Sequence, residues 1–531
     1  MKQFIALVKV SFRGIISSAG SRGAKSGSRK RSTDPVAGFL LLLTALIVGY
    51  STMYCNMIIG SLCKAGCPEL LFAIWALASI ILPAFIGLMG ASSFIFGGKD
   101  NTILLPAPVR PIILLAAKTS SLYFEMLFMT ALIMIPAAVT FALHAEMTAG
   151  MVVMFAIGLL FIPLISCAID MIFGELVAFF GSRSKHKALV SNTISIAFIA
   201  AIMVWGFSQS SDASETLDIE GILQKISWCR PAMLFADAAG KGNVVSFLIF
   251  VAVASACALL TAFIISRFYI GIISRSSGVS VSHDYRIGHF RGRGQLKALY
   301  MKEMKKVIGT SSYFLNCVIG AIMLLIASIV IAVRADEVRQ MMAEDPDAAA
   351  MVFIMGMVGT LFCVSMVPTT AASISIEGKN LWILKGAPVP SSVIFKAKVL
   401  ASITFTGVLT TISTVIFAVA IRMNIVQFIL YLAVGLIGCV LMALFGLMMN
   451  LKFPKLDAVN EIYIYKQSAS VGFMVLVGFV ISILAAAVLL VLTYTVNVYA
   501  ASLITAAIML ILVFACVHNL EHKGKTAFER L

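Results

Sequence analysis

Twelve apolar runs divide this chain of 531 residues, and each is long enough to cross a membrane. A helix needs roughly 20 apolar residues to span the hydrocarbon layer of a bilayer. Hydrophobic residues make up 60% of the chain and charged residues only 12%, whereas about a quarter of a soluble domain is charged. The sequence therefore predicts an all-α, polytopic integral membrane protein with about 12 transmembrane helices. The runs cover residues 36–60, 70–96, 119–144, 148–178, 188–208, 244–266, 312–333, 349–376, 399–421, 425–451, 469–494 and 499–518.

The basic residues predict which side of the membrane each connecting segment faces. If both termini are cytoplasmic, 33 of the 40 Lys and Arg residues lie in cytoplasmic segments, as the positive-inside rule requires. The net charge of +16 then faces the anionic lipids of the inner leaflet rather than a nucleic acid. We therefore expect a multi-pass protein of the cell (cytoplasmic) membrane.

Two cytoplasmic segments, 98–118 and 378–398, are nearly the same. At a constant offset of 280, nine of 21 positions are identical, and each copy stands between two apolar runs. This pattern is typical of a duplicated membrane unit. One interpretation is that both loops were merely inherited from the duplication and cap their helices. Because the neighbouring runs diverged while the loops did not, we favour a site that meets a common partner twice.

Each half also begins with a basic amphipathic segment, 3–16 in the first half and 296–308 in the second. Such segments are typical of helices lying on a membrane surface. After the prolines of each repeated loop, residues 112–118 and 391–398 are expected to form a short separate helix on the inner surface. The expected divisions are a basic tail with its amphipathic helix (1–35), a first six-helix half (36–266), a cytoplasmic linker with the second amphipathic helix (267–311), a second six-helix half (312–518) and a C-terminal tail (519–531).

Two segments of the chain resemble loops of a known protein family. The segment 377–389, which reads EGKNLWILKGAPV, is similar to the loop between the second and third spans of ABC-2-type transporter permeases. The segment 450–468, which begins NLKFPKLD, resembles a later cytoplasmic loop of the large, duplicated bacterial members. The resemblance covers nearly the whole chain in span count and loop placement, and its motifs are specific to the family but not to a substrate.

The resemblance implies a permease subunit that couples ATP hydrolysis by a separate subunit to translocation of an unidentified substrate. We favour an exporter over an importer. The repeated loops would be the segments that dock two copies of this ATP-binding subunit. The first copy departs from the pattern, since Gly97 replaces Glu377 and Thr102 replaces Trp382. The implied coupling residues are Gly98, Lys99, Pro106, Pro108 and Lys118 in the first copy and Glu377, Gly378, Lys379, Trp382, Lys385, Pro388 and Lys398 in the second.

Three carboxylates, Glu125, Asp170 and Glu175, fall within the third and fourth runs. Intramembrane charges often mark a substrate or ion path, but we favour the interpretation that these three are buried helix-end acids paired with neighbouring Lys or Arg. The limits of the fourth run stay open because it is long and contains two of them. A secondary, ion-coupled carrier and a non-transporting assembly or sensor component therefore remain alternative functions.

The sequence contains no recognisable catalytic, cofactor-binding or metal-binding motif. The phosphate-loop pattern G-x-x-x-x-G-K-[ST] is absent from the sequence, and no catalytic, cofactor-binding or metal-binding constellation emerges, so an enzyme is not expected. The sequence leaves open a disulfide among four cysteines on the expected outer side, Cys55, Cys63, Cys67 and Cys229.

Overall fold

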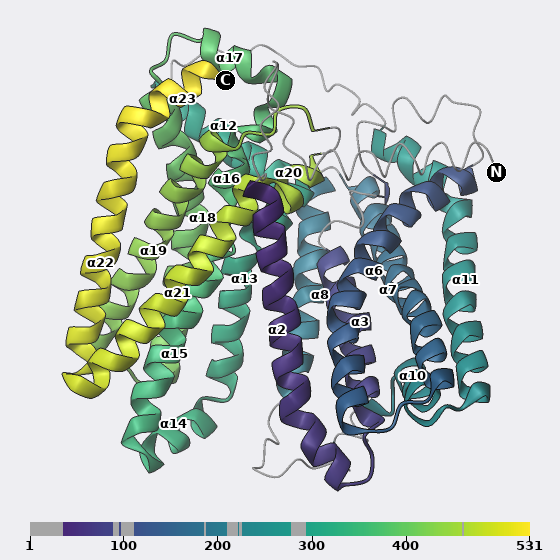
Figure 1. Cartoon of the computed structure of the whole chain (residues 1–531). Coiled ribbons are helices and arrows are strands. Elements are labelled where there is room, and N and C mark those ends of the chain that lie inside the picture. The colour runs from purple at the N-terminus through teal and green to yellow at the C-terminus, as the bar shows by residue number, and fades with distance from the viewer. Residues whose placement is uncertain are drawn as a thin grey trace, which may run out of the picture. The chain divides into compact units, whose positions relative to one another are not determined.

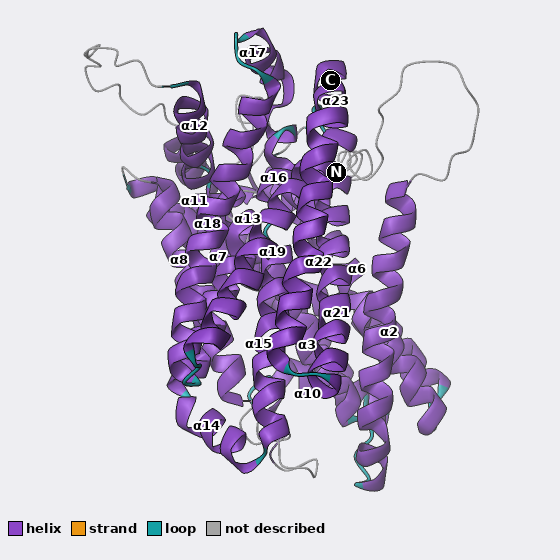
Figure 2. Cartoon of the chain, turned by 90° about the vertical axis from the view of Figure 1, so that its left-hand side faces the viewer, coloured by secondary structure: helices purple, strands orange, loops and turns teal. Residues whose placement is uncertain are grey.

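The computed structural model describes residues 35–88, 95–96, 111–184, 187–209, 221, 226–277, 294–458 and 461–531. Helices form nearly all of this described chain, and no strand occurs in it (Figure 2). Twelve of the described helical segments are long and apolar enough to cross a membrane. The prediction of an all-α, polytopic membrane protein is therefore confirmed.

The helices fall into two compact units (Figure 1). The first consists of Met1–Ser191 and Trp205–Ser280, and the second of Asn192–Val204 and Val281–Leu531. The middle of the fifth span thus groups with the second unit, although the sequence analysis placed that span in the first half. The helices of residues 1–280 are α2 (Pro35–Lys64), α3 (Leu70–Leu88), α6 (Pro111–His144), α7 (Ala149–Arg183), α8 (Lys187–Gln209), α10 (Arg230–Lys241) and α11 (Val244–Ser277).

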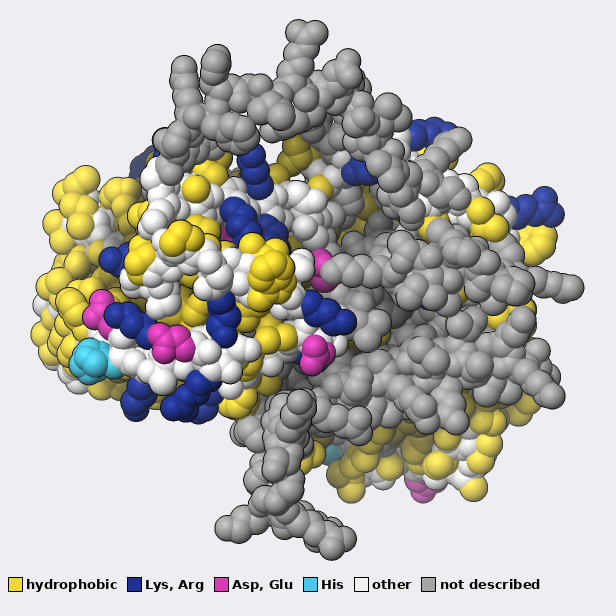
Figure 3. Space-filling model, turned by 90° about the horizontal axis from the view of Figure 1, so that it is seen from above, with side chains coloured by type: hydrophobic (Ala, Val, Ile, Leu, Met, Phe, Trp, Pro, Cys, Tyr) yellow, Lys and Arg dark blue, Asp and Glu magenta, His cyan; other side chains and the backbone are white. Residues whose placement is uncertain are grey.

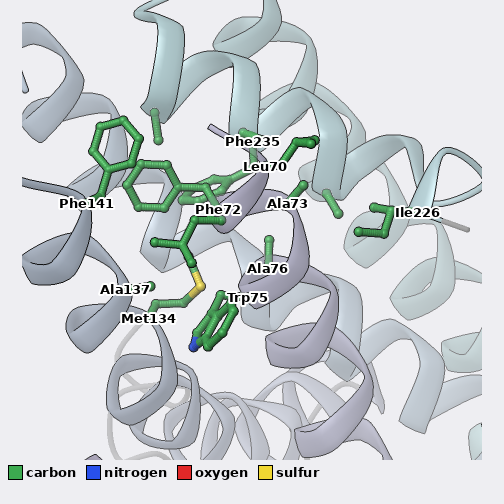
Figure 4. Packing of buried hydrophobic residues seen from close by; sticks show 14 of the residues in the cluster. Leu70, Phe72, Ala73, Trp75, Ala76, Met134, Ala137, Phe141, Ile226 and Phe235 are labelled. Atoms are coloured by element: carbon green, nitrogen blue, oxygen red, sulfur yellow. The ribbon is translucent and has the colours of Figure 1, made fainter. Parts of the chain in front are cut away.

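A cluster of aromatic side chains forms a core of the first unit (Figure 4). Phe72 of α3 lies at its centre, with ring centroids 4.6 Å from Phe141 of α6 and 6.3 Å from Phe235 of α10. A Cβ on Gly158 of α7 would meet the Phe235 ring at 2.6 Å, so the glycine makes room for it. The sequence analysis treated residues 209–243 as an external connection, yet part of this connection is a helix whose apolar face is buried.

Besides Asn192–Val204 of α8, the second unit contains the amphipathic helix and six further spans. Its helices are α12 (Gln295–Gly309), α13 (Ser311–Val333), α14 (Ala335–Glu344), α15 (Pro346–Ser365), α16 (Thr369–Ser373), the 3₁₀ segment η2 (Ser375–Asn380), α17 (Leu381–Gly386), α18 (Ser391–Ala420), α19 (Ile425–Lys452), α20 (Ile462–Gln467), α21 (Ala469–Thr495), α22 (Val498–Asn519), the π-helical turn η3 (Leu520–Gly524) and α23 (Lys525–Arg530).

Local sequence sets where several of these helices begin. The side-chain oxygens of Asn424 and Asn497 accept hydrogen bonds from backbone N–H groups three residues later, both at 2.8 Å. Such N-caps satisfy donors that a helix start would otherwise leave unpaired. Asp345 caps α15 in a similar way, and Pro346 follows it at the first helical position. Proline is favourable there because a backbone N–H at this position would have no partner within the helix.

The structure corrects two helix boundaries. The eighth run, expected to be continuous over 349–376, is interrupted after α15, and α16 starts only at Thr369. Pro368 stands at this break, where its ring and missing N–H oppose continuation of the helix. Residues 112–118 and 391–398 do not form separate surface helices, because α6 and α18 each run through them without interruption.

The ten cysteines are all free thiols, so the disulfide that the sequence left open is not formed. The second amphipathic segment, expected over 296–308, is confirmed as a helix by α12. The first, over 3–16, lies outside the described residues.

Candidate functional site

The second repeated loop contains the most distinctive polar arrangement in the second unit. Lys398, in the second turn of α18, has a side chain that is only 1% exposed. Its Nζ lies 2.7 Å from Oε1 of Glu303 on α12 and 3.4 Å from Oε1 of Glu377 on η2. It also donates a hydrogen bond of 2.9 Å to the carbonyl oxygen of Ser373. A buried ammonium group is thus surrounded by acceptors from three other segments.

Two more lysines of α12 complete what we call the Lys398 cluster, which consists of Lys302, Glu303, Lys306, Glu377 and Lys398. Lys302 and Lys306 lie 2.9 and 3.4 Å from the same Oε1 of Glu377. Burial lowers the pKa of Lys306, and the attraction of Glu377 offsets part of this effect. With three ammonium groups and two carboxylates, the cluster carries a formal charge of +1 and joins the amphipathic helix to the repeated loop.

A second network holds the backbone of the same loop. Oδ1 of Asn450, at the end of α19, accepts hydrogen bonds from the N–H groups of Ile374 and Ser375 at 2.7 and 3.1 Å. Its Nδ2 donates to the hydroxyl oxygens of Ser375 and Ser470. The backbone N–H of Lys455 also donates to the Ser375 hydroxyl at 3.0 Å. The two segments that resemble permease loops, around 377–389 and 450–468, therefore meet at Ser375.

Gly378 lies between these two networks and has φ 52° and ψ −129°, a conformation that residues other than glycine rarely adopt. A Cβ at this position would lie 3.3 Å from the carbonyl oxygen of Leu456. Both the backbone conformation and the close neighbour require glycine, which explains why this residue occurs in the loop.

The short helix α17 follows directly and presents two large apolar side chains to its surroundings. Trp382 is 69% exposed and Ile383 is 54% exposed, whereas Leu381 and Leu384 are buried. The buried pair anchors α17, so the exposed pair is held in a fixed position.

Further contacts hold α17 and the segment after it from both sides. Lys385 donates a hydrogen bond of 3.0 Å to the carbonyl oxygen of Glu529 in α23, and Gln295 of α12 donates one of 3.2 Å to the carbonyl oxygen of Pro388. α12, α17 and α23 lie at the same end of the second unit (Figures 1 and 2). Lys379 is exposed beside them.

In the first unit, Lys118 of the first repeated loop is buried in α6 and donates to the carbonyl oxygen of Ile95 at 3.5 Å. Lys118 and Lys398 thus occupy equivalent positions, and each binds a carbonyl oxygen of the segment that precedes its loop. The remaining residues predicted in the first copy, Gly98, Lys99, Pro106 and Pro108, lie outside the described residues.

Glu125 lies near the middle of α6, and Asp170 and Glu175 lie in the second half of α7. Roughly 20 residues of helix cross the hydrocarbon layer, so a span that starts at Ala149 ends near residue 168, before Asp170 and Glu175. Counted back from His144, the same length reaches Glu125 in α6. Within the described part of the first unit, neither Glu125 nor Glu175 forms an ion pair with Lys or Arg, so the expected pairing does not occur there.

Asp170 is fully buried and contacts α3, since a Cβ on Gly87 would overlap its carboxylate. At the offset of 280, its counterpart in the second half is Asn450. The role of Asn450 in binding the loop backbone therefore suggests an equivalent structural role for Asp170.

Sequence reasoning did not identify Glu303 or the role of Asn450. The signal for Glu303 was present, because Glu303 and Val307 are four residues apart and form the buried face of an otherwise basic helix. Among the described residues, no group of three or more His, Cys, Asp and Glu side chains is placed to hold a metal ion.

Fold and site together define a polytopic, all-helical membrane protein with a rigidly held loop at the basic end of its second unit. No protein-family model matches the chain, and no curated protein is significantly similar to it.

Proposed function

We propose that this protein is the membrane permease subunit of an ATP-driven exporter, and that α17 docks a separate ATP-binding subunit. The proposal rests on the resemblance of segments 377–389 and 450–468 to permease loops and on the geometry of the second loop. One observation carries it, which is the exposure of Trp382 and Ile383 on a short helix that is anchored by its buried Leu381 and Leu384. Two copies of the ATP-binding subunit are expected, one for each repeated loop.

The environment of α17 favours a protein partner. Buried aromatic side chains contribute most of the energy at protein interfaces, and charged residues around them contribute mainly to association rate and specificity. Trp382 and Ile383 have this arrangement, since Lys379 and Lys385 lie on either side of them in the sequence. The anchoring contacts reduce the conformational entropy that docking would otherwise cost.

The test is the substitution Trp382→Ala in the full-length, tagged protein purified from its native membranes. Loss of an interface hot spot costs about 2 kcal/mol or more, which corresponds to docking that is about 30-fold weaker. We therefore expect less ATP-binding subunit to copurify with the variant, and weaker stimulation of ATP hydrolysis by the permease. Thr102→Ala, at the equivalent position of the first copy, is expected to have a clearly smaller effect.

A matched control is Trp228→Ala, which removes another exposed tryptophan, 56% exposed, from a segment predicted to face the opposite side of the membrane. This variant should copurify the ATP-binding subunit normally. If Trp382→Ala leaves copurification and stimulation unchanged while the protein stays folded, Trp382 is only a lipid-facing residue and the docking proposal fails.

A further inference from the structure

A cavity of about 300 Å³ lies at the same end of the second unit, between α18, α19, α22 and η3. Its walls are apolar and include Phe395 and Val399 of α18, Leu444 of α19 and Leu520 of η3. Leu400, which also lines it, is 42% exposed, so the cavity opens at the surface of the helix bundle. Since α18, α19 and α22 are among the helices long and apolar enough to cross a membrane, a lipid of the bilayer can reach the cavity.

The C-terminal segment builds one side of the cavity. At η3 the chain adopts a π-helical turn, an uncommon geometry that often occurs at functional positions. Beyond this turn α23 packs back on α18, where the rings of Phe528 and Phe395 meet edge to face at 5.6 Å. The turn and this contact bring Lys525 to the cavity, which the C-terminal residues therefore help to form.

The polar side chains that line the cavity carry an excess of positive charge. They are Lys396, Lys525, Glu521 and Ser392, and the three charged ones are exposed. Within the described part of the chain, neither Lys396 nor Lys525 forms an ion pair. Lys and Arg side chains are spread over this end of the second unit (Figure 3), the end that the charge pattern predicts to be cytoplasmic.

We propose that this cavity is a binding site for an anionic phospholipid of the inner leaflet. Part of an acyl chain fills the apolar interior, and the phosphate group binds between Lys396 and Lys525. Basic pockets between transmembrane helices on the cytoplasmic side bind anionic lipid head groups in this way. Glu521 opposes the interaction and sets its strength. The proposal does not depend on the docking of an ATP-binding subunit at α17.

The test measures thermal unfolding of the purified, full-length protein in a neutral detergent during titration with lipid. Phosphatidylglycerol should raise the unfolding temperature, whereas phosphatidylcholine with the same acyl chains and inorganic phosphate alone should not. Each lysine near a membrane surface contributes enough attraction for about a fivefold change in affinity. The double variant Lys396→Ala/Lys525→Ala should therefore bind phosphatidylglycerol about 25-fold more weakly.

Three further variants make the test specific. Lys523→Ala removes an exposed lysine of the same C-terminal segment that does not line the cavity, and it should bind as the unchanged protein does. Glu521→Gln should tighten binding about fivefold. Val517 of α22 also lines the cavity, so Val517→Phe should weaken binding by filling it. Equal stabilisation by the two lipids, or unchanged phosphatidylglycerol binding in the double variant or in Val517→Phe, would overturn the proposal.

Discussion

Replacing Lys398 with methionine would remove the central charge of the Lys398 cluster but keep an unbranched side chain. At an effective dielectric constant of about 20, charges 2.7 Å apart attract each other by about 6 kcal/mol before desolvation is subtracted. Removing one partner of a buried ion pair typically destabilises a protein by about 3–5 kcal/mol, because the other charge stays buried. We expect Lys398→Met to lower the free energy of unfolding by about 3–5 kcal/mol.

The structure also predicts which partner is affected most. Glu377 keeps its contacts with Lys302 and Lys306, whereas Glu303, 5% exposed, loses the only ion pair that it forms within the described residues. The double variant Lys398→Met/Glu303→Gln should therefore be more stable than the sum of the two single effects predicts. The expected coupling is about 2–3 kcal/mol, the upper part of the range for residues in one network.

The assay is reversible unfolding in mixed micelles by sodium dodecyl sulfate, followed by circular dichroism. Lys305→Met is a suitable control, because Lys305 lies on the same amphipathic helix but is exposed. Its effect should stay within about 0.5 kcal/mol. The reasoning is refuted if Lys398→Met is no more destabilising than Lys305→Met, or if the effects of the double variant are additive.

Three shorter predictions follow from the same unfolding assay. Gly378→Ala should destabilise the protein by about 1–3 kcal/mol because of its backbone conformation, whereas Gly386→Ala, where nothing lies within 4 Å of the new Cβ, should not. Asp170→Asn should be tolerated because Asn450 provides an amide at the equivalent position of the second unit. Asn450→Asp should destabilise the protein through loss of the two hydrogen bonds that its Nδ2 donates, and the reverse order would contradict the proposed equivalence. Burial lowers the pKa of Lys455 to about 8 from 10.5. Between these two pH values the unfolded chain binds the proton more tightly than the folded protein, so the free energy of unfolding should rise with pH. Lys455→Gln should reduce this rise, and an unchanged pH dependence in the variant would contradict the assignment.

The lengths of the apolar runs predicted the fold class because a helix must have a minimum length to cross a bilayer. They could not locate the break at Pro368, since proline also occurs inside uninterrupted helices of this chain, at Pro83, Pro136 and Pro163. They also missed the buried face of α10. Phe235 packs against Phe72, more than 160 residues earlier in the chain, and no local pattern reports such a contact.

The candidate site was predicted in part. The role of Trp382 in docking stays a prediction, although its side chain is exposed. The Lys398 cluster was not foreseen because Lys398 and Glu303 are 95 residues apart. A lysine at the start of a membrane helix is ordinarily interpreted as an interfacial residue, and only the fold shows that this one is buried.

The comparison of the two repeated loops changes what their similarity means. Among the identical residues, Gly378 is required by the backbone, and Lys118 and Lys398 each bind a buried carbonyl oxygen. These identities are explained by the architecture of each half and need no common partner.

The residues that suit docking are those that differ between the loops. Glu377, which fixes the second loop to α12, is replaced by Gly97, and the exposed Trp382 is replaced by Thr102. The position equivalent to Glu303 is Gly23, and no Asp or Glu occurs in residues 1–33, so the first half cannot build the same cluster from its own amphipathic segment. A partner that recognises the anchored tryptophan must therefore bind the second loop more tightly than the first. If two ATP-binding subunits attach, their affinities should be unequal, and Trp382→Ala should remove the tighter class of sites while leaving the weaker one.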